Sequence, residues 1–199
     1  MHYPQVEKVA RKMRHEPDVK FQKLSAFGVQ ANTRGYFTKD EFLEICQWKS
    51  ARRIALCKSN PVQDIQKCTA QALAATDEGN RIRALLKLKG VAVPTASALL
   101  AVSSPALFGV IDIRAWQFLY SVGVVDRNRR GINLSVRNWL QYLKVLRAVA
   151  KTVGTTPRLV EISLYSAHKQ RQKGSLYSGQ ASNHSIKRTC LRQAAYVKR

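Results

Sequence analysis

Apolar residues recur with helical spacing along nearly the whole chain, and no alternating apolar run is long enough to predict a β-strand. Helix-start signals support this pattern, because Thr38 and Glu41 have the spacing of a capping box and Pro157 falls in a first helical turn. We therefore expect an all-α fold, and 199 residues are enough to bury a sizeable core in one compact unit. The predicted helices cover residues 3–14, 21–37, 38–49, 62–75, 77–88, a segment starting at 94, 112–122, 134–153 and 157–169.

A tight turn is predicted between two of these helices. The apolar pattern of the first helix ends at Leu88, and Pro94 begins the second, where its missing N–H costs nothing. Gly90 can adopt a positive φ, and Val91 can fill the space between the two helices. The expected structure is therefore helix, hairpin, helix.

This turn is a candidate phosphate-binding element. Backbone amides at the start of the second helix, near Ala92 and Thr95, suit a phosphate oxygen, and Lys87 and Lys89 would add positive charge. An ordinary helical hairpin closed by a glycine is the simpler alternative if the turn is considered alone.

Positive charge is concentrated in the second part of the chain. Overall, 34 Lys and Arg oppose 12 Asp and Glu, a net charge of +22. Residues 1–78 hold 13 basic and 9 acidic side chains, whereas residues 79–199 hold 21 and 3, a net charge of +18. Such an excess favours nucleic acid as the partner, with binding that weakens steeply as salt rises. A membrane surface is the weaker alternative as a partner, and no run of about 18 apolar residues is present that could span a membrane, so no membrane partner is expected.

Asp112 is the most unusual of the three acids that follow residue 78. Asp126 lies in a polar loop and Glu161 falls early in a predicted helix, so both have ordinary explanations. Asp112 is instead embedded in the apolar segment 108–113, FGVIDI, just before a helix. An N-cap is the simplest role for it. A cap would also hold the carboxylate at the mouth of the helix, so capping does not exclude catalysis.

Two motifs together resemble the helix-hairpin-helix superfamily of base-excision DNA glycosylases. Residues 88–96, LKGVAVPTA, are similar to the family pattern Leu-Pro-Gly-Val-Gly-x-x-Thr-Ala, and residues 110–114, VIDIR, are similar to its Val-Asp-Thr-His segment. In the lyase members an essential aspartate follows a nucleophilic lysine by 18 residues. Here Asp112 follows Pro94 by the same 18 residues. The close resemblance covers about 35 residues.

The resemblance implies a fold, a reaction and a partner. The early and late helices would form one lobe of residues 1–169, the middle helices the other, and a cleft would lie between them. Asp112 would be the catalytic carboxylate that stabilises positive charge on the sugar while the bond to the base is hydrolysed. The hairpin residues Lys87, Lys89, Gly90, Val91, Ala92 and Thr95 would bind the backbone of double-stranded DNA. The resemblance therefore predicts a DNA repair N-glycosylase.

Three departures from the family pattern refine this expectation. Pro94 replaces the lysine and cannot form a Schiff base, so a monofunctional enzyme is predicted. Ala92 replaces a hairpin glycine and would cost about 1 kcal/mol if the position required a positive φ. Arg114 stands where several relatives carry histidine; it could hold a phosphate or could be a solvated helix charge.

A glycosylase needs a pocket for the base that it removes from the stack, usually with aromatic walls. Core packing is the simpler role for each of the aromatic candidates. The base-pocket candidates are Tyr36, Phe37, Trp48 with Lys49, Trp116 and Tyr120.

No metal or other cofactor is expected. The cysteines are Cys46, Cys57, Cys68 and Cys190, and no Cys-x-x-Cys pair is present. We expect the first three to be buried small apolar side chains in a reducing compartment.

Residues 170–199 have the composition of a basic tail that adds DNA affinity, with a docked final helix as the alternative. A monomer in the cytoplasm, associated with the nucleoid, is the expected state. Two other functions remain open: a non-catalytic helix-hairpin-helix DNA-binding protein, and a basic RNA-binding or nucleoid-binding protein.

Overall fold

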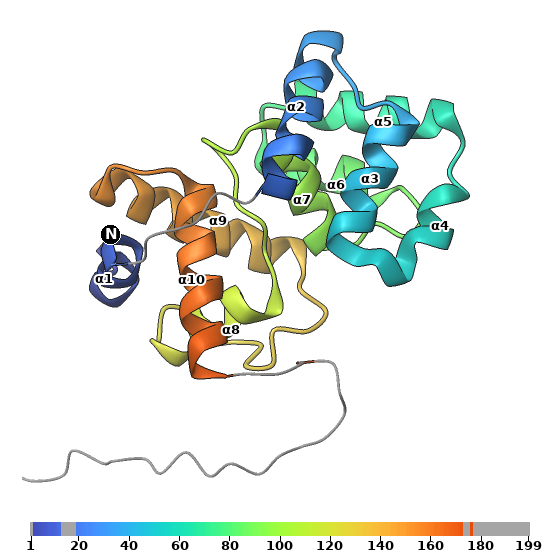
Figure 1. Cartoon of the computed structure of the whole chain (residues 1–199). Helices are drawn as coiled ribbons and strands as arrows, with labels where there is room; N and C mark the ends of the chain where they lie inside the picture. Colours follow the sequence, from blue (N-terminus) through green and yellow to red (C-terminus); the bar gives the residue numbers. More distant parts are fainter. Residues whose placement is uncertain (1, 13–18, 173–175, 177–199) are drawn as a thin grey trace, which may run out of the picture.

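The computed structural model describes residues 2–12, 19–172 and 176, and within them every regular element is helical (Figure 1). The all-α expectation is therefore confirmed for this part of the chain. Of the predicted basic tail, residues 170–172 and 176 are described, whereas the rest of it, with the alternative docked helix, lies outside the described residues. The helices are α1 (Pro4–Lys12), α2 (Val19–Arg34), α3 (Lys39–Ser50), the 3-10 turn η1 (Ala51–Arg53), α4 (Ile54–Lys58), α5 (Val62–Ala74), α6 (Glu78–Leu86), α7 (Val93–Ser103), α8 (Ile113–Ser121), α9 (Val136–Val153) and α10 (Pro157–Arg171).

Local capping signals set several of these helix ends. The Thr38 hydroxyl accepts from the Glu41 amide, and the Glu41 carboxylate accepts from the Thr38 amide, so the capping box is confirmed. Thr156 caps α10 directly before Pro157. The short elements η1 and α4 were not expected, because neither has a side-chain cap at its start.

Helix α7 is buried almost along its full length and has apolar residues on all sides. It packs against α2, α3 and α6 and also touches α9. Gly28 of α2 permits the closest approach, because a Cβ there would lie 2.0 Å from the carbonyl oxygen of Val102. This close packing makes α7 the central element of the fold.

The other helices form two groups. Helices α8, α9 and α10 pack together with α1, whereas α2, α3, α5 and α6 pack together with α7 (Figure 1). Helix α9 joins the two groups through contacts with α6 and α7. The segment between α7 and α8 crosses from one group to the other. Asp112 lies at the end of this crossing segment, directly before α8.

Buried hydrogen bonds hold this crossing segment in place. The Glu161 carboxylate accepts from the Val110 amide at 3.3 Å, and the Tyr142 hydroxyl donates to the Val110 carbonyl at 3.2 Å. The Ile111 amide donates to the Ser97 hydroxyl of α7 at 3.1 Å. The segment directly before Asp112 is thus held by hydrogen bonds from both groups of helices.

The three cysteines in the described residues, Cys46, Cys57 and Cys68, are buried and free, as expected, whereas Cys190 lies outside that region. No cluster of His, Cys, Asp and Glu suited to a metal ion occurs among the described positions. In residues 2–12 and 19–172, no helix has the length and apolar character needed to cross a membrane.

Candidate functional site

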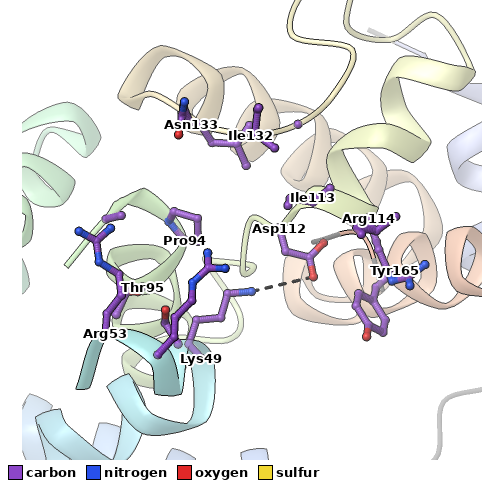
Figure 2. Close-up of a pocket in the computed structure, with 16 residues that line it drawn as sticks. Lys49, Arg53, Pro94, Thr95, Asp112, Ile113, Arg114, Ile132, Asn133 and Tyr165 are labelled. Atoms are coloured by element: carbon purple, nitrogen blue, oxygen red, sulfur yellow. Dashed lines mark ion pairs between the residues drawn. The ribbon is translucent and has the colours of Figure 1, made fainter. Parts of the chain in front are cut away.

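A pocket of about 540 Å³ opens beside Asp112, where the starts of α7 and α8 come together (Figure 2). Its other walls come from the end of α3 with η1, from the loop before α9, and from α10. Its lining residues are Lys49, Ser50, Arg52, Arg53, Ala92, Pro94, Thr95, Asp112, Ile113, Arg114, Gly131, Ile132, Asn133, Leu134, Tyr165 and Leu176.

Asp112 caps α8 with one carboxylate oxygen and faces Lys49 with the other. Its Oδ1 accepts from the Ala115 amide at 2.8 Å, while its Oδ2 lies 3.9 Å from the Lys49 Nζ (Figure 2). The two side chains are only 21% and 17% exposed. The expected N-cap is therefore present, and the second oxygen remains directed toward the pocket.

The negative charge of Asp112 acts on buried groups behind it. Burial raises the pKa of the Glu161 carboxyl; the paired Arg158 guanidinium opposes this shift and Asp112 adds to it. Burial also raises the pKa of the Tyr142 hydroxyl, with Glu161 and Asp112 adding to the effect. The field of Asp112 is thus exerted in a region from which water is largely excluded.

Arg114 links the pocket to the end of α10. Its guanidinium donates to the Gln172 carbonyl at 2.7 Å and lies 3.5 Å from the His168 Nδ1. Burial lowers the pKa of His168, the Arg114 charge lowers it further, and Asp112 acts in the opposite direction. Arg114 therefore lines the pocket and also holds the carboxyl end of a neighbouring helix.

The turn between α6 and α7 has the backbone that its sequence predicts. Gly90 has a φ of +80°, and Val91 is buried. A Cβ at Gly90 would also meet the Cys57 Sγ at 2.7 Å. Ala92 has a φ of −108°, so alanine carries no left-handed strain at that position. The replacement of glycine by Ala92 is compatible with an unstrained turn.

Asn60, which follows α4, fastens this turn. Its Oδ1 accepts from the Lys89 amide at 2.8 Å, and its Nδ2 donates to the Lys89 carbonyl at 2.9 Å. The side chain of Lys87 reaches Gln71 of α5 at 3.2 Å. Of the predicted phosphate-binding residues, Ala92 and Thr95 line the pocket, whereas Lys87, Lys89, Gly90 and Val91 do not.

Most of the predicted aromatic pocket residues lie elsewhere. Trp48 packs on Phe21 with ring centroids 5.7 Å apart. Phe37 is buried in the core, as is Trp116, whose indole N–H donates to the Asn128 carbonyl at 2.9 Å. These rings have the structural role that was the simpler alternative.

Tyr36 and Tyr120 also lie outside the pocket lining, and the Arg34 guanidinium covers the Tyr36 ring at 5.0 Å. Among the described lining residues, Tyr165 is the aromatic one. Of the predicted set, Lys49 alone lies in the pocket, paired with Asp112.

The sequence interpretation missed several residues of the pocket. Arg52 and Arg53 lie in η1, three and four residues after Lys49, so a cluster of basic residues around the end of α3 was the available signal. Ile132 and Asn133 come from the loop before α9, and Asn133 has a φ of +50°, a conformation that asparagine tolerates better than most residues. Tyr165 gave no local signal, because only tertiary packing brings α10 to the site.

Comparisons with protein families, curated proteins and solved structures find no match for this chain. The functional conclusion therefore depends on the residues of the site.

Proposed function

We propose that the protein is a DNA N-glycosylase related to the helix-hairpin-helix superfamily, which hydrolyses the bond between a damaged or modified base and its sugar. The observation that carries this proposal is the arrangement of Asp112 at the pocket: one oxygen is fixed by the Ala115 amide, and the other faces the cavity beside Lys49. A carboxylate held in this way needs little rearrangement to act on a ligand.

The proposed reaction uses this fixed negative charge. As the glycosidic bond breaks, positive charge develops on the sugar, and a partly desolvated carboxylate next to C1′ lowers the barrier. Asp112 would also orient the water that adds to C1′. The products would be the free base and an abasic site in the DNA.

The turn at Gly90 is proposed to be the hairpin that holds the DNA backbone. Its positive φ, the Asn60 bonds to Lys89 and the lack of a side-chain cap at the start of α7 support this role. An uncapped helix start is suited to a phosphate oxygen. Lys87 and Lys89 would contribute charge at the backbone, outside the base pocket.

The two groups of helices are proposed to be the two lobes of the glycosylase architecture, with the pocket between them. Its walls come from α3 and α7 on one side and from α8 and α10 on the other. Double-stranded DNA entering between them would meet the strongly basic second part of the chain. A monomer associated with the nucleoid is the proposed state.

We further propose that the enzyme is monofunctional. Pro94, where the lyase members have their lysine, lies in the pocket wall and has no amine for a Schiff base. Strands should therefore break only after the abasic product is treated with alkali or with a separate lyase.

The test is an excision assay on duplexes that each carry one damaged or modified base, followed by alkali. Wild-type protein should give alkali-dependent breaks with at least one of them, and Asp112→Asn should lose most of this activity while binding DNA as well as wild type. Asp126→Asn is the matched control, because Asp126 lies in a loop outside the pocket. Full activity of a folded Asp112→Asn protein would contradict the catalytic assignment.

A non-catalytic DNA-binding protein is the second candidate, favoured by the cap that Asp112 provides to α8. It predicts salt-sensitive binding to duplex DNA with no base released from any substrate. An RNA-binding protein would instead prefer RNA in competition with duplex DNA of equal length.

A further inference from the structure

The pocket beside Asp112 carries an excess of positive charge. Lys49, Arg52, Arg53 and Arg114 line it, and Asp112 is the single carboxylate among the lining residues that the structure describes. These formal charges give a net value of +3 around the cavity. The starts of α7 and α8 also lie at the pocket, and helix N-termini add partial positive charge.

The pocket has few groups that could bind a cation. Proteins hold cationic ligands with carboxylates or with several aromatic faces. In the described lining, Asp112 already faces Lys49, and Tyr165 is the aromatic residue. The aromatic pair Phe21 and Trp48 holds the guanidinium of Arg158, at 4.2 and 5.7 Å from the two ring centroids. This aromatic pair is thus occupied by the protein's own arginine.

The DNA backbone would not neutralise all of this charge. A nucleotide drawn into the pocket brings two flanking phosphates, each with one negative charge. If both were paired with arginines of the pocket, a net positive charge would remain around the base. A base that is itself positive would be repelled, whereas negative charge that develops on a departing base would be stabilised.

We propose that this pocket accepts an uncharged base, which departs as an anion, and rejects a base that already carries positive charge, such as an N-alkylated purine. The inference rests on the proposed function and names its substrate class. In the reaction, the electron pair of the C1′–N bond leaves with the base nitrogen, and water adds to C1′. The proton lost from that water is taken up by the departing base or by solvent.

Binding tests this selectivity without requiring catalysis. The test uses two duplexes that differ only in the charge of one purine. The first carries 7-methylguanine, a positively charged base, on a 2′-fluorinated sugar that resists cleavage. The second carries 7-methyl-7-deazaguanine, a base of the same shape without the charge, on the same sugar. Wild-type protein should bind the uncharged duplex at least about 10-fold more tightly. Equal affinity, or tighter binding of the cationic duplex, would overturn the proposal.

Charge removal at the pocket supplies the second comparison. Arg53→Gln removes one pocket charge. It should reduce the ratio of the affinities for the uncharged and the cationic duplex several-fold. The matched control Lys144→Gln removes one charge from the exposed face of α9, outside the pocket, and should leave the preference unchanged. If both variants change it equally, the preference does not come from the pocket, and the proposal fails.

Single-turnover excision separates this inference from the proposed function. Release of uracil or hypoxanthine, with little release of 7-methylguanine or 3-methyladenine, supports both. Release of the cationic bases alone supports the glycosylase and overturns the charge selectivity. If no base is released but the uncharged duplex is still bound more tightly, the charge selectivity of the pocket stands. The enzymatic function is then rejected, together with departure of the base as an anion.

Discussion

Asn60 and Lys89, 29 residues apart in the chain, are joined by two hydrogen bonds in opposite directions. The Asn60 Nδ2 donates to the Lys89 carbonyl, and the Asn60 Oδ1 accepts from the Lys89 amide. The Nδ2 also donates to the Cys57 carbonyl, at 2.9 Å. The side chain is buried. A short helix that has no cap of its own is thereby tied to the turn that we propose to contact DNA.

The first prediction is that Asn60→Ala destabilises the protein and weakens DNA binding. Lys89 would lose partners for both of its main-chain groups in a partly buried setting, at a cost of about 1–3 kcal/mol. Denaturant unfolding measures the loss. Asn80→Ala, in the exposed first turn of α6, is the control and should change stability by less than about 0.5 kcal/mol. Equal effects of the two substitutions would show that the Asn60 contacts contribute nothing specific.

The second prediction separates the structural role of Asp112 from its chemical role. Asparagine is as good an N-cap as aspartate, so Asp112→Asn should keep the thermal stability of wild type, whereas Asp112→Ala should lose about 1 kcal/mol. Both should lose excision activity. If Asp112→Asn is inactive and also strongly destabilised, loss of activity cannot be assigned to the carboxylate charge.

The third prediction concerns the salt dependence of DNA binding. If Lys89 neutralises one phosphate, Lys89→Ala should reduce the slope of log affinity against log salt by about 0.9. Asn60 holds the main chain of Lys89 and not its amine, so the substitution should leave the turn folded. Fluorescence anisotropy with a labelled duplex measures both slopes. An unchanged slope would mean that the Lys89 amine does not contact the backbone.

The fourth prediction concerns stability at mildly acidic pH. His168 has a pKa lowered below its usual 6.5, mainly by burial and then by Arg114. The unfolded chain therefore binds a proton in a range where the folded protein does not, and stability should fall as the pH drops below about 6.5. Chemical unfolding between pH 7.5 and 5 should show a smaller decline for His168→Gln. An equal decline in wild type and in His168→Gln would contradict this prediction.

Local sequence patterns predicted the longer helices but only part of the candidate site. The capping box at Thr38, the turn at Gly90 and the cap at Asp112 depend on neighbouring residues, so the sequence alone could indicate them. The pairing of Lys49 with Asp112 joins residues 63 positions apart and arises only when α3 and α8 are brought together. No local pattern specifies that encounter.

The aromatic candidates have the expected residue type but do not line the pocket. Trp48 and Trp116 have the residue type that a base pocket needs, yet large rings are also the best means of filling a core. One packs on Phe21, and the other is fully buried with its indole N–H bonded to a loop carbonyl. Residue type could not separate the two roles; only the direction of each side chain did.

The buried position of α7 has a consequence for how the molecule unfolds. Because this helix is apolar on all sides, exposing either side of it to water is costly, and it contacts α9 of one group as well as α2, α3 and α6 of the other. The two groups should therefore melt in a single transition, with coincident midpoints whether unfolding is followed near Trp48 or near Trp139. Opening of the pocket in the folded protein should then involve side chains and loops, because separating the helix groups would break the contacts of α9 with α6 and α7.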